Sequence, residues 1–315
     1  MNLKDYISIA RPTHWFKNIF IIPGVIFAAI LTKNNFDAFY LNFLYCIVSS
    51  CLAASANYVI NEWLDAKYDK FHPTKKERPA VLGKLRFRYV FIEYLFLISI
   101  SIFIATKISI YFFCTTILFL IMGVLYNLKQ FRTKDKMYLD VISESLNNPI
   151  RLMLGWFTVT TYPLPPSSLV IGYWMGGAFL MAIKRYAEYK AIGDPLIASS
   201  YRNSFKYYNE ENLLVSSFFY ASCSSFFLGI FLIKYKLELL FSLPLLAGLF
   251  AWYLKIGMQK DSPAQNPEKL FMQKHFIIYL LLLSTIICIL LIIDQPSLKW
   301  FLNNAFLEAQ QFKQY

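Results

Sequence analysis

Several stretches of this chain run for about 20 residues without a charged side chain, for example 213–233 and 276–293. A helix needs about 20 apolar residues to cross the hydrocarbon core of a bilayer. Lipid offers no hydrogen-bond partner to an open backbone, so such stretches must be helical. The runs are continuous rather than alternating, which argues against a β-barrel. The sequence therefore predicts an all-α, polytopic membrane protein.

The apolar stretches predict about nine transmembrane helices within a single domain, residues 1–315. Hydrophobic residues make up 57% of the chain and charged residues 16%, against about 25% charged in an average soluble domain. No cleavable signal peptide is expected, because the polar start leads directly into the first apolar run. The nine spans are expected at 16–32, 40–60, 89–106, 108–126, 138–160, 168–184, 213–233, 237–255 and 275–293.

The net charge of +12 is unevenly distributed. With nine spans, one side collects the N-terminus and the segments 61–88, 127–137, 184–212 and 255–274, which together carry 24 of the 31 Lys and Arg residues. The positive-inside rule places this side in the cytoplasm. The expected location is therefore the plasma or inner membrane, with the N-terminus and the active site cytoplasmic. The apolar excess argues against a nucleic-acid partner.

The first acidic motif consists of Asn61, Asp65 and Asp69, each four residues apart. Residues at this spacing share one face of a helix, where two carboxylates repel unless a cation lies between them. Mg²⁺ prefers such oxygen ligands and commonly bridges to substrate phosphates. Lys75, Lys76 and Arg78 follow at once and suit the remaining phosphate charge. Two alternatives stay open: a solvated helix end, and a basic anchor for anionic lipid.

The second acidic motif is Asp140 and Glu144, again four apart, with Arg151 further along the same predicted helix. Ionisable groups within a span usually face a bundle interior or a wet cavity. Both acids follow Asp65 and Asp69 by the same offset, which hints at an internal repeat. Two acid-bearing helices facing each other are suited to holding a diphosphate through metal ions. The alternative is an internal salt bridge between Glu144 and Arg151.

These motifs resemble those of the UbiA superfamily of intramembrane prenyltransferases. The first corresponds to Asn61-x3-Asp65-x3-Asp69 followed by Arg78-Pro79, and the second to Tyr126, Lys129, 139–141, Arg151 and Gly155. Glu62 and Glu144 stand where this family usually has Asp. The segments 11–18, 72–79 and 184–188, with Arg202 and Tyr207-Tyr208 after the last, are most similar to the decaprenyl-phosphate phosphoribosyltransferase branch.

The resemblance implies a bundle of nine helices around a central cavity that opens to the cytoplasm and sideways to lipid. It also implies Mg²⁺, a phosphoribosyl diphosphate donor and a polyprenyl phosphate acceptor within the lipid bilayer. The oligomeric state stays open, a homo-oligomer included. The implied catalytic residues are Asp65, Asp69 and Asp140. The implied metal ligands are Asn61, Asp65, Asp69, Asp140 and Glu144. The implied substrate-binding residues are Lys17, Lys75, Lys76, Arg78, Tyr126, Lys129, Arg151, Lys184, Arg185 and Glu188.

Three other interpretations remain at this point. The first is a prenyltransferase that moves a prenyl group from a prenyl diphosphate to a small acceptor. The second is a transporter of an anionic solute, and the third is a catalytically altered relative of the family. The segment 184–188 favours a phosphorylated sugar donor over a prenyl diphosphate. Acids clustered at the cytoplasmic helix ends suit a metal better than they suit a transported anion.

Overall fold

The computed structural model describes residues 3–32, 39–71, 75–128, 130–265, 267–295 and 298. Within these residues all regular structure is helical. Eight segments are long and apolar enough to cross a membrane, which confirms the predicted all-α membrane fold. They are Leu3–Thr32, Phe39–Asp69, Phe87–Ala105, Ile110–Asn127, Ser167–Ile192, Glu210–Tyr235, Leu237–Gly257 and Lys274–Ile292.

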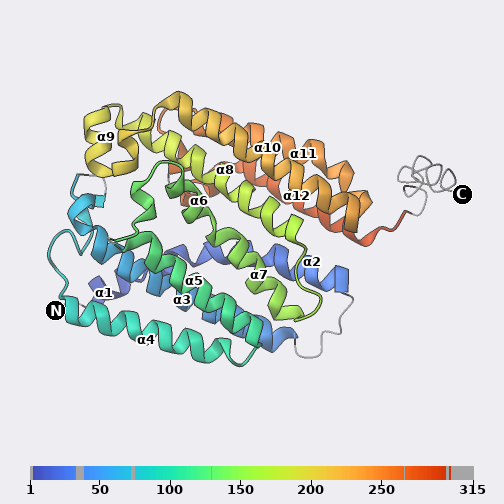
Figure 1. Ribbon diagram of the computed structural model, residues 1–315, viewed down its shortest axis with the longest axis horizontal. Helices are drawn as coiled ribbons and strands as arrows, with labels where there is room; N and C mark the ends of the chain where they lie inside the picture. The colour runs from blue at the N-terminus through green and yellow to red at the C-terminus, as the bar shows by residue number, and fades with distance from the viewer. Residues whose placement is uncertain are drawn as a thin grey trace, which may run out of the picture.

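The helices lie roughly side by side along the long axis of the molecule (Figure 1). The longer ones are α2 (Ile22–Thr32), α3 (Phe39–Asp69), α4 (Phe87–Ala105), α5 (Ile110–Asn127), α7 (Asn147–Val159), α8 (Ser167–Ile192), α10 (Glu210–Tyr235), α11 (Leu243–Gly257) and α12 (Lys274–Ile292). Three short helices are α1 (Leu3–Ile9), α6 (Leu139–Ser145) and α9 (Pro195–Tyr201). The α1 and α9 helices lie at the same end of the bundle, at the left of Figure 1 and named here the polar end.

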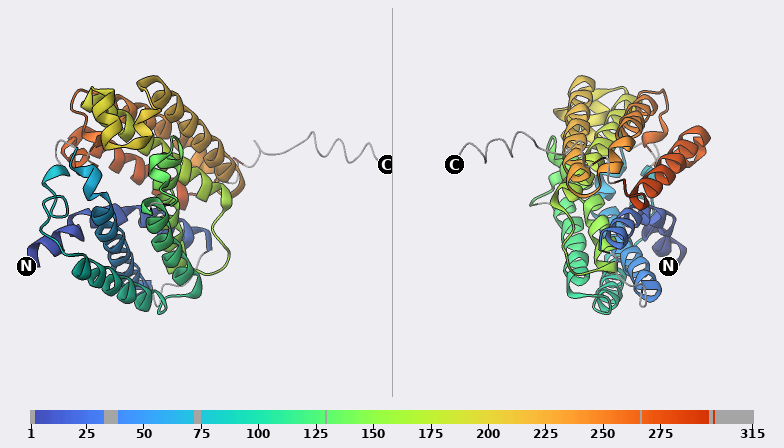
Figure 2. Two further views of the ribbon diagram at one scale, coloured as in Figure 1. Left: turned by 60° about the vertical axis from the view of Figure 1, so that its left-hand side comes forward. Right: turned by 90° about the vertical axis from the view of Figure 1, so that its right-hand side faces the viewer.

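Two groups of helices can be followed in Figures 1 and 2, with α6 and α7 between them. One group contains α3, α4 and α5, and the other contains α8, α10, α11 and α12. The bundle contains two large apolar cores. The core with Phe112, Phe119 and Trp156 joins α3, α5 and α7 to parts of α8, α10 and α12. The core with Phe179 and Tyr253 lies among α8, α10, α11 and α12. A polar site between the two groups is thus walled by packed helices.

The predicted span 138–160 is not a single helix, because it breaks at Leu146 into α6 and α7. Pro149 explains the break: its ring clashes with the carbonyl four residues earlier, that of Ser145. The indole of Trp174 on α8 donates to the carbonyl of Ile142, at 3.1 Å, and so satisfies one backbone group near the break. The break gives α6 its own direction at the polar end.

The α3 helix continues well beyond its apolar part and ends at Asp69. The predicted span ended near residue 60, but the polar residues that follow extend the same helix instead of forming a loop. Asn61, Asp65 and Asp69 therefore stand on successive turns of one rigid element. The prediction that these three residues share one helical face is confirmed, because the helix continues past the end of its apolar part.

Two glycines allow the N-terminal segment to touch α7. A Cβ built on Gly24 would lie 1.9 Å from the carbonyl oxygen of Leu152, and one on Gly155 would lie 2.1 Å from that of Ile21. Both contacts are with backbone, which cannot swing away as a side chain can. This crossing fixes the 3₁₀ segment η1 (Pro12–Ile21), which carries Lys17, against the bundle.

Gly155→Ala is expected to destabilise the protein by about 1–3 kcal/mol, because the added methyl forces α7 away from η1. Gly229→Ala is the matched control, since a Cβ there meets nothing within 4 Å. The measurement is the thermal unfolding of each variant in detergent. Equal stability of the two variants would contradict the close-crossing argument.

Candidate active site

A cavity of about 470 Å³ lies at the polar end. Its walls come from η1, α3, α5, α6, α8 and α9, and from the loop that contains the short 3₁₀ turn η3 (Thr133–Asp135). The structure brings together there ten of the residues that the sequence singled out. They are Lys17, Asn61, Asp65, Asp69, Lys75, Arg78, Tyr126, Glu144, Lys184 and Glu188.

The acidic face of α3 is occupied by a lysine that the sequence analysis did not select. Lys134 Nζ donates to Asp65 Oδ1, lies 2.6 Å from Asn127 Oδ1 and 3.5 Å from Asn61 Oδ1. Burial is the main cause of a lowered pKa of Lys134, about 8; Asp65 opposes the shift, whereas Arg132 and Arg202 add to it. A cation thus lies among one carboxylate oxygen and two amide oxygens. It does not lie between the two carboxylates of α3, because Asp69 pairs with Arg78 instead.

This oxygen set fits a divalent cation of the Mg²⁺ type. The ammonium of Lys134 stands where carboxylate and amide oxygens converge, and these are the ligands that Mg²⁺ prefers. Among the described residues, no three His, Cys, Asp or Glu side chains gather closely enough to hold a metal. Mg²⁺ commonly uses one or two carboxylates and completes its shell with water and substrate phosphate. Asn61 and Asp65, whose oxygens converge there, could therefore hold it together with a ligand.

Asp69 and Lys75 each have a partner near the C-terminal end of α3. Arg78 forms an ion pair with Asp69. Lys75 Nζ donates to the hydroxyl of Tyr201 and lies 4.7 Å from the centre of its ring. Lys76, predicted to bind substrate alongside Lys75, is exposed and does not line the cavity. Lys129 lies outside the described residues.

The two acids of the second motif contact the same guanidinium. Arg185 forms ion pairs with Asp140, Glu144 and Glu188, and its side chain is fully buried. Glu144 also accepts from the hydroxyl of Tyr126, at 2.8 Å. Asp140 and Glu144 do share a helical face, as predicted, and both pair with Arg185 on α8.

Asp140 does not line the cavity. Its carboxylate is fully buried and accepts from Tyr208 at 2.8 Å, Ser204 at 3.1 Å and Arg185 at 3.3 Å. Tyr208 and Ser204 belong to the segment that follows α9, which folds over the start of α6. The geometry gives Asp140 the role of anchoring that segment, and offers no free oxygen to a metal in the cavity.

Arg151 lies deeper and also away from the cavity. It donates to Asn18 Oδ1 at 3.0 Å and to the Asn147 carbonyl at 3.2 Å. The alternative of a Glu144–Arg151 salt bridge is wrong, because Glu144 pairs with Lys184 and Arg185. Asn18 ties η1 to α7 through this contact.

Several cavity residues were not among the predicted site residues. Arg11 pairs with Glu62 at 2.6 Å, and Arg132 pairs with Asp65 at 3.1 Å and Asp135 at 2.7 Å. Arg202 and Tyr201 enter from α9 and the residue after it. The sequence did carry a signal for them: Arg11 and Arg202 belong to the resemblance to the phosphoribosyltransferase branch, and Arg132 lies in the basic segment 127–137.

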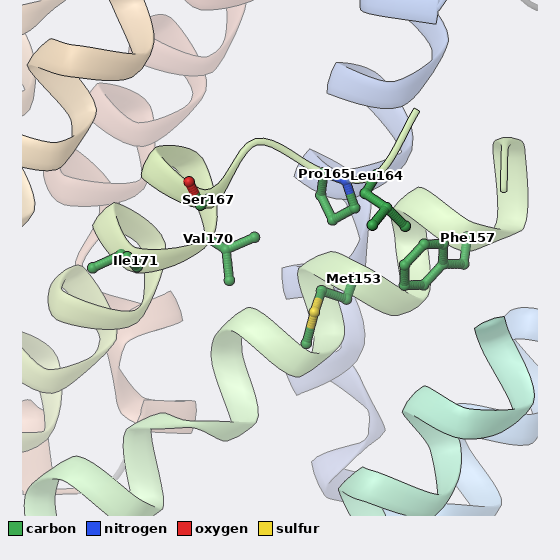
Figure 3. Close-up of a pocket in the computed structure, with 7 residues that line it drawn as sticks. All are labelled: Met153, Phe157, Leu164, Pro165, Ser167, Val170 and Ile171. Atoms are coloured by element: carbon green, nitrogen blue, oxygen red, sulfur yellow. The ribbon is translucent and has the colours of Figure 1, made fainter. Parts of the chain in front are cut away.

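A second pocket, of about 300 Å³, lies between the end of α7 and the start of α8 (Figure 3). The described residues that line it carry no charge, so it offers no acid, base or metal ligand. They are Met153, Phe157, Leu164, Pro165, Ser167, Val170 and Ile171.

Asp140→Asn is expected to lower the stability of the protein by on the order of 3 kcal/mol, because it takes one anion from a buried guanidinium that cannot deprotonate. Asp65→Asn should cost less, since Lys134, with its pKa near 8, can release a proton. Thermal unfolding of both variants in detergent checks this difference. An Asp140→Asn protein of unchanged stability but with weakened binding of Mg²⁺ would instead assign Asp140 to a metal.

Comparison with known proteins supports the same fold and family. Residues 20–281 match the UbiA prenyltransferase family. The chain is similar in fold to a UbiA homolog from Archaeoglobus fulgidus bound to GPP and Mg²⁺, with a TM-score of 0.70 and 17% identity over 91% of this chain and 99% of that chain. A structure of digeranylgeranylglyceryl phosphate synthase gives a TM-score of 0.60 and 14% identity, over 92% of this chain and 96% of that chain.

Two relatives are more similar in sequence. Nodulation protein NoeC of Azorhizobium caulinodans is 28% identical over 184 residues, 58% of this chain and 57% of that protein. Decaprenyl-phosphate phosphoribosyltransferase of Mycolicibacterium smegmatis is 28% identical over 193 residues, 59% of this chain and 57% of that protein. The chain thus spans somewhat more than half the length of these relatives. Because the family match covers well over half of the chain, the chain belongs to the UbiA prenyltransferase family.

Proposed function

We propose that this protein is a magnesium-dependent membrane transferase that moves a phosphoribosyl group from phosphoribosyl diphosphate to a polyprenyl phosphate. The polar end, with its surplus of Lys and Arg, would face the cytoplasm, where a soluble donor is available. The acceptor would approach within the bilayer. Similarity to the phosphoribosyltransferase of M. smegmatis supports this choice.

The observation that carries the proposal is the lining of the cavity. None of its described lining residues is Leu, Ile, Val, Met or Phe. A prenyl diphosphate would need apolar surface directly beside its diphosphate, because an isoprenoid chain gains its binding energy from burial away from water. A ribose that carries phosphates on two sides needs the opposite: hydroxyl groups, amides and cations close together.

The charges in the cavity support the same donor. Eight Lys or Arg side chains and six carboxylates are among its lining residues. Most carboxylates already have a cationic partner: Glu62 pairs with Arg11, Asp65 with Lys134, and Asp69 with Arg78. Bound Mg²⁺ would raise the positive charge further. Such a site is suited to a substrate with several phosphate groups.

Asn61, Asp65 and Asp69 would hold Mg²⁺ against the donor diphosphate. When bound, the metal supplies charge neutralisation on the departing diphosphate. Arg78, Lys75 and Lys184 would complete that neutralisation, since they line the same cavity. A preorganised set of cations stabilises the charge that develops on a leaving group without reorganising during the reaction.

Lys17 would hold the acceptor phosphate. It lies on η1, directly before the apolar helix α2, and its Nζ is 3.2 Å from His14 Nδ1. A phosphate bound there would leave its isoprenoid chain beside the membrane-spanning part of the bundle. An oxygen of the acceptor phosphate would attack the anomeric carbon of the ribose as diphosphate leaves. No general base is required, because a phosphate monoester is already ionised near neutral pH.

Purified protein in lipid nanodiscs is expected to make a lipid-linked phosphoribosyl product from labelled phosphoribosyl diphosphate and decaprenyl phosphate. Chelation of Mg²⁺ should abolish the product, as should Asp65→Asn, because the donor diphosphate then lacks its metal bridge. Chromatography of the labelled lipid gives the measurement. Turnover of geranyl diphosphate with no lipid-linked ribose would instead favour a prenyltransferase. Magnesium-independent uptake of an anion into liposomes would indicate a transporter.

Lys75→Met is expected to raise the KM for the donor about tenfold or more, because a hydrogen bond between charged groups is worth about 1.5–3 kcal/mol. Lys76→Met is the matched control: it removes the same charge one residue away, from an exposed side chain. The initial rate against donor concentration checks both. An equal effect of the two substitutions would mean that general surface charge, not a contact in the cavity, sets the affinity.

A further inference from the structure

The Arg202 side chain is a mostly buried cation with two unused hydrogen-bond donors. It lines the cavity, and its side chain is 13% exposed. Its Nε and Nη1 atoms are buried and have no hydrogen-bond partner among the described residues. The carboxylate of Asp140 is 3.5 Å from Nη1, too far for a good hydrogen bond. Because buried donors are nearly always satisfied in folded proteins, these two indicate an acceptor that enters the cavity.

The neighbours of Arg202 hold it in place without using those donors. Its Cζ atom lies 5.9 Å from the ring centres of both Tyr201 and Phe205. The segment that carries it is tied to α6, because Ser204 and Tyr208 donate to Asp140. The guanidinium is therefore presented to the cavity by a fixed frame, and Asp140 is a positioning residue for it.

Further cations lie around Arg202. Lys75 contacts Tyr201, the residue directly before Arg202. Lys134 is near enough that Arg202 helps to lower its pKa. Asp65 already forms ion pairs with Lys134 and Arg132. Glu188 already forms an ion pair with Arg185. The Nε and Nη1 donors of Arg202 are thus available to an anion, and a planar guanidinium is well suited to bind two oxygens of a phosphate.

Two phosphate monoesters fit this chemistry, one on the ribose of the donor and one at the head of the lipid acceptor. The position of Arg202 favours the donor. It follows α9 at the polar end (Figure 1), outside the membrane-spanning segments. None of the described residues that line the cavity there is Leu, Ile, Val, Met or Phe, the side chains that would receive an isoprenoid chain. Lys17, in contrast, adjoins the apolar helix α2.

We infer that Arg202 binds the 5-phosphate of the ribosyl donor and thereby makes the site specific for a sugar that carries both a phosphate and a diphosphate. This inference rests on the proposed function. It gives the α9 segment a role in donor selection, since a prenyl diphosphate has no second phosphate to satisfy Arg202.

Kinetics of Arg202→Gln and Arg202→Lys in nanodiscs test this inference. Arg202→Gln is expected to raise the KM for phosphoribosyl diphosphate about 10- to 100-fold. The KM for decaprenyl phosphate should stay unchanged, and Arg202→Lys should recover part of the loss.

Ribose 5-phosphate should inhibit the parent protein, whereas ribose should not, and this inhibition should be lost in Arg202→Gln. Inorganic diphosphate should inhibit both proteins alike. Arg88→Gln, at an exposed arginine on α4, is the matched control.

The outcomes separate this inference from the proposed function. A parent protein that makes the product while Arg202→Gln keeps its donor KM would overturn the role of Arg202 alone. A raised KM for decaprenyl phosphate instead would assign Arg202 to the acceptor and also overturn the inference. Absence of product from the parent protein would overturn the proposed function and this inference with it. If the variants do not fold, equal inhibition of the parent by ribose and by ribose 5-phosphate is sufficient to reject it.

Discussion

The buried guanidinium of Arg185 holds the polar end of this protein together. It sits on α8 and pairs with Asp140 and Glu144 on α6 and with Glu188 one turn away on its own helix. An isolated charge at this depth would be very costly, so the fold must surround it with anions and hydrogen bonds. Its three carboxylates thereby fix α6 against α8. Tyr126 on α5 joins the same network through Glu144.

This network also explains the placement of the segment 195–208. Asp140 uses one oxygen for Arg185 and Ser204 and the other for Tyr208. The turn that follows α9 is therefore anchored to the same carboxylate that anchors α6. The cavity is consequently bounded on one side by a loop that is held from within the bundle, and not by contacts at the surface.

Charge pairing is also what shapes the chemistry of the cavity. The acids of α3 are matched by Lys134 and Arg78, so the cavity is neither strongly acidic nor closed to anions. When a ligand binds together with a metal ion, the metal can replace Lys134 and Arg78 as the partner of the acids, and the phosphates can replace the acids as partners of the cations. Such an exchange keeps every buried charge compensated, which a purely acidic or purely basic cavity would not allow.

The sequence by itself determined the membrane fold and the acidic face of α3. Uninterrupted apolar runs leave the backbone no alternative to helices in lipid, and spacing of four residues places Asn61, Asp65 and Asp69 on one face whatever the surroundings. Only the tertiary structure decided which other charges reach the cavity. Asp140 and Glu144 share a face as well, yet their partner is Arg185, far away along the chain, and no local pattern encodes that pairing. Likewise Lys134 resembled an ordinary basic loop residue, and the resemblance that included Arg202 gave no sign of its surroundings, because burial and partners belong to the packed structure and not to the order of residues.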